Sequence, residues 1–142
     1  EKKDRVDDAL AATRAAIEEG IVPGGGVALL RAVQGIEDFV YKDSQSLGAQ
    51  ILIKATEAPL RCMLDNAGLD SSVIISKIKS NTTHFDYGYN AKTDKYERLM
   101  KTGIIDPTKV VRVALENAAS VAGMLLTTEC VITELKEEKN EH

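Results

Sequence analysis

The feature that most constrains the fold is a long apolar stretch that begins at Asp106-Pro107 and runs to about Thr128. Asp is a favoured N-cap residue and Pro a favoured first helical residue, so the stretch is predicted to be a helix capped by Asp106. Apolar side chains surround most of its circumference, and such a helix needs neighbours on nearly every side. The remaining residues supply few neighbours, so partner helices and strands are predicted to be missing from this sequence.

The totals limit the function classes. A chain of 142 residues fits one domain or a piece of one. A net charge of −4 with no basic run argues against nucleic acid as a partner. No stretch is expected to be long and apolar enough to span a bilayer, and no secretory signal is expected at the N-terminus. Cys62 and Cys130 lack metal-like spacing, so we expect buried, reduced thiols and no metal site.

Residues 1–19 are predicted to form a helix from the spacing of their apolar positions. One narrow face consists of Val6, Leu10, Thr13 and Ile17. At 100° per residue, Asp8 lies about 190° from the centre of that stripe. The face around Asp8 also carries Asp4, Ala11, Ala15 and Glu19. Most carboxylates of this kind are solvated helix charges, but the small alanines would let another group approach Asp8.

Glycines follow this first helix. Gly20 stands where a helix C-cap favours a left-handed residue, and Gly24 to Gly26 present bare backbone that a ligand can approach. The N–H groups at the start of the next predicted helix, residues 24–35, favour anions. The motif lacks the Gly-Lys-Ser/Thr ending of a phosphate-binding loop and follows no predicted strand. A tight turn between two packed helices is the alternative interpretation.

The remaining elements are predicted from periodicity and turn residues. A third helix spans about 44–66, and Asp70 caps a short fourth helix. Residues 85–89 and the turn at 90–94 indicate a small hairpin whose aromatic rings cover a satellite core. Residues 129–135 are predicted to be a closing strand, followed by a frayed charged tail. The side of the third helix expected to be buried contains Leu47, Ile51, Leu52, Ala55 and Ala58.

Several stretches together match one family in order along nearly the whole chain. They are Arg5–Leu10, Ala12–Ala16, Glu18–Gly20, Gly24–Leu29, Glu57–Arg61, Tyr87–Ala91, Gly103–Val110, Ala118–Gly123 and Thr127–Cys130. On these residues the chain resembles the C-terminal portion of a group I chaperonin, the large ring-forming subunit. The resemblance implies a mainly α fold, the helical bundle of the equatorial domain with a small β-hairpin and a C-terminal strand. It assigns residues 1–18 to the intermediate domain, 19–135 to the C-terminal half of the nucleotide-binding equatorial domain, and 136–142 to a disordered tail.

The resemblance also implies roles for single residues. Asp8 matches the catalytic aspartate that swings down on ATP and positions the attacking water. Gly24 and Gly25 match the glycine turn against the nucleotide, and Ile104 matches an apolar wall of the base pocket. Asp106 matches the carboxylate that binds the ribose hydroxyls, a role it could combine with capping the helix. The residues that match positions around the adenine are Asn90, Ala91 and Lys92.

The function that the resemblance implies is that of an ATP-dependent chaperone, an ATPase as a full ring, that encloses and refolds client proteins. Its implied partners are ATP, other subunits of the ring and, through an apical domain that this sequence lacks, a co-chaperonin and unfolded clients. The implied location is a bacterial cytoplasm or an organelle matrix. The alternative is a stand-alone helical interaction module that binds no nucleotide.

The sequence departs from the family pattern in ways that affect the chemistry. It has no Gly-Asp-Gly-Thr-Thr phosphate loop and none of the family's metal-binding aspartates, so Mg and K ions are expected to be held by the N-terminal half of the subunit. Pro23 and Lys92 are not the commonest residues at their positions. Without a metal site, phosphoryl transfer loses its main electrostatic stabilisation. We therefore expect that this piece alone does not turn over ATP.

Overall fold

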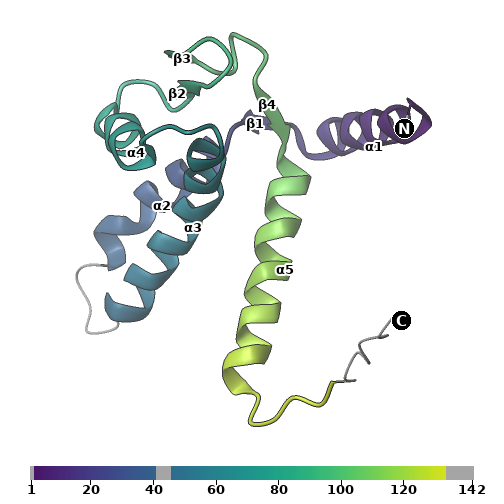
Figure 1. Cartoon of the computed structure of the whole chain (residues 1–142), viewed down its shortest axis with the longest axis vertical. Helices are drawn as coiled ribbons and strands as arrows, with labels where there is room; N and C mark the ends of the chain where they lie inside the picture. Colours follow the sequence, from purple (N-terminus) through teal and green to yellow (C-terminus); the bar gives the residue numbers. More distant parts are fainter. Residues whose placement is uncertain (1, 41–45, 134–142) are drawn as a thin grey trace, which may run out of the picture.

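The computed structural model describes residues 2–40 and 46–133, with residues 36–40 and 46 described as backbone only. Within these residues the protein is mainly helical with two small antiparallel strand pairs, which confirms the predicted fold class. Figure 1 shows α2, α3, α4 and the β2–β3 pair in one cluster, from which α1 and α5 extend in different directions. The elements are α1 (Lys2–Glu19), β1 (Ile21–Pro23), α2 (Val27–Val40), α3 (Ser46–Asn66), α4 (Ser71–Ser80), β2 (Tyr87–Asn90), β3 (Lys95–Arg98), β4 (Ile105–Pro107) and α5 (Thr108–Thr127).

A strand pair joins the region after α1 to the start of α5. Gly20 follows α1 with φ of +80°, and its N–H donates to the Ala16 carbonyl over 2.8 Å, as predicted for a helix C-cap. β1 then runs antiparallel to β4, with Val22 opposite Asp106. The sequence predicted no strand before the glycine turn. Three residues carry too little periodicity to reveal one, and β1 exists because β4 supplies its hydrogen-bonding partner.

The apolar core lies between α2, α3 and α4. Its buried members are Leu30, Leu60, Leu64, Ile74, Ile75 and Ile78. Asp70 caps α4 as predicted, because its Oδ1 accepts hydrogen bonds from the N–H groups of Ser72 and Val73 at 3.0 and 3.2 Å. The hydrophobic side chains of this cluster account for the close packing of the three helices around one centre.

The predicted buried side of α3 is wrong. The expected residues Leu47, Ile51 and Leu52 are exposed, and α3 instead buries Ile53 and Leu60. The reason is tertiary, because α2 and α4 cover only one face of α3. Another face, including Leu52, turns toward α5 and lines a hollow of about 430 Å³ between the two helices. The remaining residues of the expected side, Ala55 and Ala58, are exposed as well.

The predicted hairpin is confirmed, although its first strand begins at Tyr87 rather than Phe85, which is exposed. β2 and β3 pair with Tyr89 opposite Tyr96. The ring of Tyr96 stacks on Tyr87 at a centroid distance of 5.9 Å and meets Tyr89 edge-on at 5.1 Å. Lys77 of α4 places its ammonium 3.9 Å from the Tyr96 ring centre, so the aromatic cluster also attaches the hairpin to α4.

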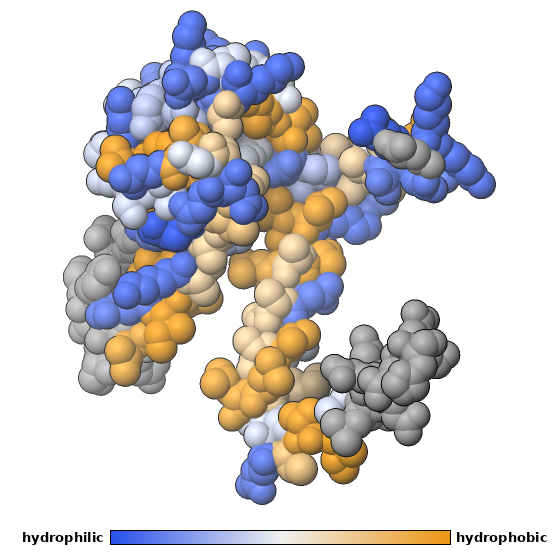
Figure 2. Space-filling model, in the orientation of Figure 1, coloured by the Kyte–Doolittle hydropathy of each residue, from blue (hydrophilic) through white to orange (hydrophobic). Residues whose placement is uncertain are grey.

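Helix α5, like α1, has no buried residue, which sets both apart from the helices α2, α3 and α4 that form the core. Leu126 is 87% exposed, and the apolar surface of α5 is visible as orange residues in Figure 2. By length and composition alone α5 could cross a membrane, which corrects the expectation that the chain holds no such stretch. Asp106 does not cap α5: the N-cap position is Pro107, without a side-chain cap bond, because Asp106 is extended within β4.

Three further expectations differ from the structure. The second helix does not end at Gly35 but continues to Val40, since a glycine weakens a helix without breaking it. The closing strand expected over 129–135 does not form in its described part, residues 129–133, where no described strand lies alongside; residues 134–135 and the tail 136–142 lie outside the described residues. Cys62 and Cys130 are exposed rather than buried.

Candidate functional site

The glycine turn between β1 and α2 packs directly on the segment that enters β4. The Gly24 N–H donates to the Ile104 carbonyl over 3.0 Å. A Cβ at Gly24 would lie 3.1 Å from the backbone of Ile104 and Ile105, so the approach requires a residue without a side chain. Gly26 has φ of +74°, and a Cβ there would lie 2.9 Å from Leu60 Cβ. The predicted residues Gly24 and Ile104 are therefore neighbours.

Asp106 lies beside this turn, through the pairing of β4 with β1. Its side chain is half-buried, and burial raises the pKa of its carboxyl. Within the described residues the carboxylate has no hydrogen-bond or ion-pair partner. The carboxylate oxygens are still within reach of water, so Asp106 offers free acceptor oxygens beside the glycine turn.

Leu99 connects the glycine turn to the hairpin. Its side chain is fully buried, and its backbone accepts from the Ile104 N–H at 2.9 Å and donates to the Asp86 carbonyl at 2.8 Å. A Cβ at Gly25 would meet Leu99 Cδ1 at 3.9 Å, an ordinary van der Waals contact. A Cβ at Gly88 would instead overlap Leu99, so the first strand of the hairpin lies against this side chain. Sequence reasoning missed Leu99, and only Gly88, an isolated glycine inside a predicted strand, could have suggested a close approach.

The predicted residues Asn90, Ala91 and Lys92 lie at the tip of the hairpin. Asn90 Oδ1 accepts from the Lys92 N–H at 3.0 Å, and Asn90 Nδ2 donates to Glu97 at 2.5 Å. The Asn90 side chain thus holds the turn, as such side chains often do, while Ala91 and Lys92 are exposed. No hydrogen bond among the described residues joins this tip to Gly24 or Asp106; Leu99, together with the packing of Gly88 on Val27, connects the two regions.

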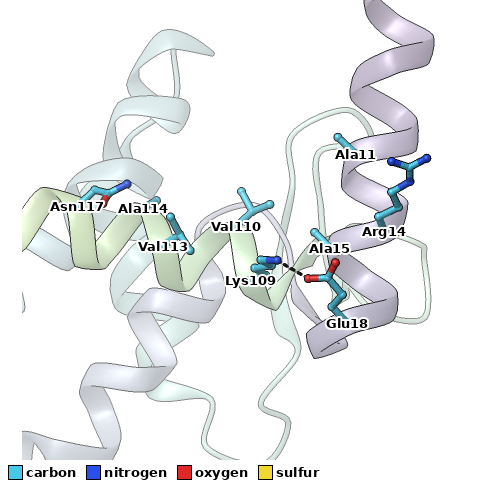
Figure 3. Close-up of a pocket in the computed structure, with 9 residues that line it drawn as sticks. All are labelled: Ala11, Arg14, Ala15, Glu18, Lys109, Val110, Val113, Ala114 and Asn117. Carbon is cyan, nitrogen blue, oxygen red and sulfur yellow. Dashed lines mark hydrogen bonds and ion pairs between the residues drawn. The ribbon is translucent and has the colours of Figure 1, made fainter.

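Asp8 lies apart from these groups. It is exposed on α1, about 18 Å along the helix axis from Gly20 at 1.5 Å per residue. Ala11 and Ala15, on the same face as Asp8, point toward α5 and line a hollow of about 600 Å³ (Figure 3). Helix α5 is thus the group that approaches this small-residue face, as the sequence led us to expect of some neighbour. The structure does not bring Asp8 itself to the glycine turn.

Ion pairs close the end of that hollow, and sequence reasoning missed them. Lys109 of α5 pairs with Glu18 of α1, as Figure 3 shows. Arg112 binds Glu19 through two bonds of 2.6 and 3.0 Å and Glu116 through two of 2.9 and 3.0 Å. The hydrogen bond from Arg112 lowers the pKa of Glu19. The sequence carried a signal for these pairs. Lys109 and Arg112 are three residues apart at the start of α5 and so share a face, and α1 ends in Glu18 and Glu19.

Metal ligands are not grouped in this part of the protein. Among residues 2–40 and 46–133, no group of three or more His, Cys, Asp and Glu side chains could hold a metal ion. Gly24 is buried against Ile104, so the accessible part of this region consists of the partly buried Gly25 and Ile104 and the free carboxylate of Asp106. Such a surface suits an organic ligand with hydroxyl donors.

The fold and this region define a mainly helical domain in which a glycine turn packs beside a half-buried carboxylate. Residues 1–136 match the model of the TCP-1/cpn60 chaperonin family. The chain therefore belongs to the TCP-1/cpn60 chaperonin family.

Proposed function

We propose that this chain is the C-terminal part of a group I chaperonin subunit and supplies one side of its ATP site. The observation that carries the proposal is the contact of Gly24 with Ile104 beside the partnerless, half-buried Asp106. Adenosine has matching chemistry, because it offers a flat apolar base and two ribose hydroxyl donors. In this reading residues 1–18 belong to the intermediate domain and residues 19–135 to the equatorial domain.

The residues of the glycine turn and β4 would hold the nucleoside. The backbone at Gly24 and Gly25 allows close approach, and Ile104 supplies an apolar wall. Asp106 would accept hydrogen bonds from the ribose hydroxyls, which offset the cost of burying its charge. Hydrogen bonds from those hydroxyls would favour the ionised carboxylate and so oppose the rise in the pKa of Asp106 that burial causes.

The hairpin tip would border the adenine. Because the side chain of Asn90 is engaged by Glu97 and the Lys92 N–H, its role is to shape the turn. Ala91 and Lys92 are the exposed groups that would approach the edge of the base. The fully buried Leu99 sets how far this tip stands from the glycine turn.

Asp8 would act only after α1 moves. Gly20 offers a pivot, since it has positive φ and nothing lies within 4 Å of a Cβ built there. The pairs of α5 with Glu18 and Glu19 would hold α1 in the present position. After the movement Asp8 would orient the attacking water. A bound metal ion would stabilise the phosphoryl charge, but the described residues supply no cluster for Mg or K, so this chain alone is expected not to hydrolyse ATP.

The exposed apolar surface supports a segment of a larger body over a stand-alone module. Helix α5 has no buried residue, and the stripe of Val6, Leu10 and Ile17 on α1 is exposed as well. Monomeric proteins rarely expose apolar patches of that extent. We propose that further chaperonin polypeptide covers these faces, that ring subunits, a co-chaperonin and client proteins are the partners, and that the protein works in a bacterial cytoplasm or an organelle matrix.

Two variants of the complete subunit test the proposal. Asp106→Ala removes charge-assisted hydrogen bonds to the ribose, so ATP affinity is expected to fall by roughly ten- to a hundredfold. Asp8→Ala is expected to keep ATP affinity and slow single-turnover hydrolysis. ATP affinity that is unaffected by Asp106→Ala would contradict the ribose role, and equal loss of binding and hydrolysis in Asp8→Ala would make Asp8 structural. A subunit that binds no ATP would favour the interaction module.

A further inference from the structure

Arg31 of α2 reaches three other segments of the fold. Its Nη2 donates to the carbonyl of Ile78 at 3.0 Å and, through two longer bonds of 3.4 and 3.5 Å, to those of His84 and Tyr87. Its Nη1 donates to Gln34 Oε1 at 2.7 Å. These carbonyls belong to the last turn of α4, the loop after it and the first residue of β2.

Among the residues that the structure describes, no carboxylate takes part in this cluster. The partners of Arg31 are carbonyl oxygens and an amide, and its Nε is buried without a partner among the described residues. The Ile78 carbonyl lies at the C-terminal end of α4, where the helix dipole favours a cation. Gln34 in turn donates to the Lys79 carbonyl at 3.1 Å, which fixes the guanidinium from its other side. A guanidinium has donors in a planar fork that can bridge several acceptors, which a lysine ammonium cannot match.

The cluster joins the two halves of the proposed nucleoside site. α2 begins directly after the glycine turn at Gly24–Gly26, and Tyr87 begins the strand that leads to the tip at Asn90–Lys92. Leu99 links these regions through its buried side chain and its backbone hydrogen bonds, and Arg31 adds a second, charged link. Because a strand pair behaves as a stiff unit, a change in direction at Tyr87 displaces the tip.

We propose that Arg31 is a positioning residue that fixes the hairpin relative to the glycine turn and so sets affinity for the adenosine part of the nucleotide. This inference rests on the proposed ATP site. Arg31 acts through the hairpin and does not touch the ligand. The phosphate end of the nucleotide is held elsewhere, so it is insensitive to Arg31.

The test compares ATP with inorganic tripolyphosphate, which lacks the nucleoside, as ligands of the complete subunit. The variant Arg31→Met keeps the apolar stem and removes all donors. We expect its ATP affinity to fall about tenfold, the size of one charge-assisted hydrogen bond, with tripolyphosphate affinity unchanged. Arg31→Lys keeps the charge at the end of α4 but cannot bridge three carbonyls, so the same selective loss is expected at smaller size.

The matched control is Arg61→Met. Arg61 also bridges elements, since it bonds Glu57 of α3 and the hydroxyls of Ser71 and Ser72 of α4, but it does not contact the hairpin. Its ATP affinity is expected to be unchanged. Equal loss of both ligands in the Arg31 variants, or ATP affinity as in the wild type, would overturn the positioning role. If Arg31→Met does not fold, the affinities of Arg31→Lys for ATP and for tripolyphosphate test the positioning role in the same way. A wild-type subunit that does not bind ATP, whether or not it binds tripolyphosphate, would instead refute the proposed function.

Discussion

Gly88→Ala tests the packing that joins the hairpin to the glycine turn. The new methyl carbon would overlap Leu99 Cδ1 and lie 2.9 Å from both Leu99 Cγ and Val27 Cγ2. Carbon atoms in contact are normally about 3.5–4.0 Å apart, so the neighbours must retreat by at least about 0.6 Å. Leu99 is 0% exposed and Val27 1%, which leaves no space to retreat into. Overpacking of this kind costs about 1–3 kcal/mol of unfolding free energy.

Urea denaturation of the 142-residue chain, followed by far-ultraviolet circular dichroism, measures the effect. Gly48→Ala is the matched control, because Gly48 is in α3 and nothing lies within 4 Å of its Cβ position. We expect that control to stabilise the chain by about 0.5–1 kcal/mol. Adding Leu99→Ala to Gly88→Ala removes the clashing atoms, so the double variant should cost less than the sum of the single ones. Strictly additive costs, or a Gly88→Ala variant as stable as Gly48→Ala, would refute the proposed contact.

Two other predictions follow from the hairpin. Arg98 binds both oxygens of Asp86, which is 1% exposed while Arg98 is 37% exposed. Arg98→Met leaves a buried unpaired carboxylate and is expected to lower the free energy of unfolding by about 3–5 kcal/mol. Asp86→Asn leaves a cation that water can reach and is expected to lower it by about 1–3 kcal/mol. Equal losses in urea denaturation would contradict this asymmetry. The hydrogen bond to Asp94 raises the pKa of Tyr89 to about 12. A raised pKa means that the folded state holds the phenol proton more tightly, so this contribution to stability is complete below about pH 10 and is lost as pH rises toward 12. Burial also raises the pKa of Tyr96, so tyrosinate absorbance should show more than one late titration. Tyr89→Phe should lower the late amplitude by one tyrosine, and Asp94→Asn should shift that share toward pH 10; a late amplitude unchanged in both variants would disprove the assignment.

The candidate site was predicted from the sequence in part. Gly24, Ile104 and Asp106 were each predicted, and the structure brings them together through the β1–β4 pair. The roles of Asp8 and of the hairpin tip stay predictions, because the tip is connected to the turn only indirectly, through Leu99 and Arg31, and α1 extends away from it. Arg31 could not be predicted, since its partners are backbone carbonyls, and every residue type carries those.

Helix ends were predicted correctly where the capping residue bonds only to residues close to it in the sequence. Gly20 ends α1 and Asp70 starts α4, because caps are satisfied within a few residues of the chain. Asp106 carried the same local signal as Asp70, yet it does not cap α5. Pairing with Val22 holds it extended, so a contact between distant segments overrides the cap.

The sequence by itself determined the helical class, the hairpin and two helix ends, which depend on residue type and short-range spacing, and its resemblance to known proteins over nearly the whole chain pointed to the chaperonin family. Only the tertiary structure decided which side of α3 is buried, that Leu52 faces α5 while Ile53 enters the core, and that Arg31 ties α2 to the hairpin. The physical reason is that periodicity shows how apolar a helix face is, whereas burial depends on which neighbours cover that face.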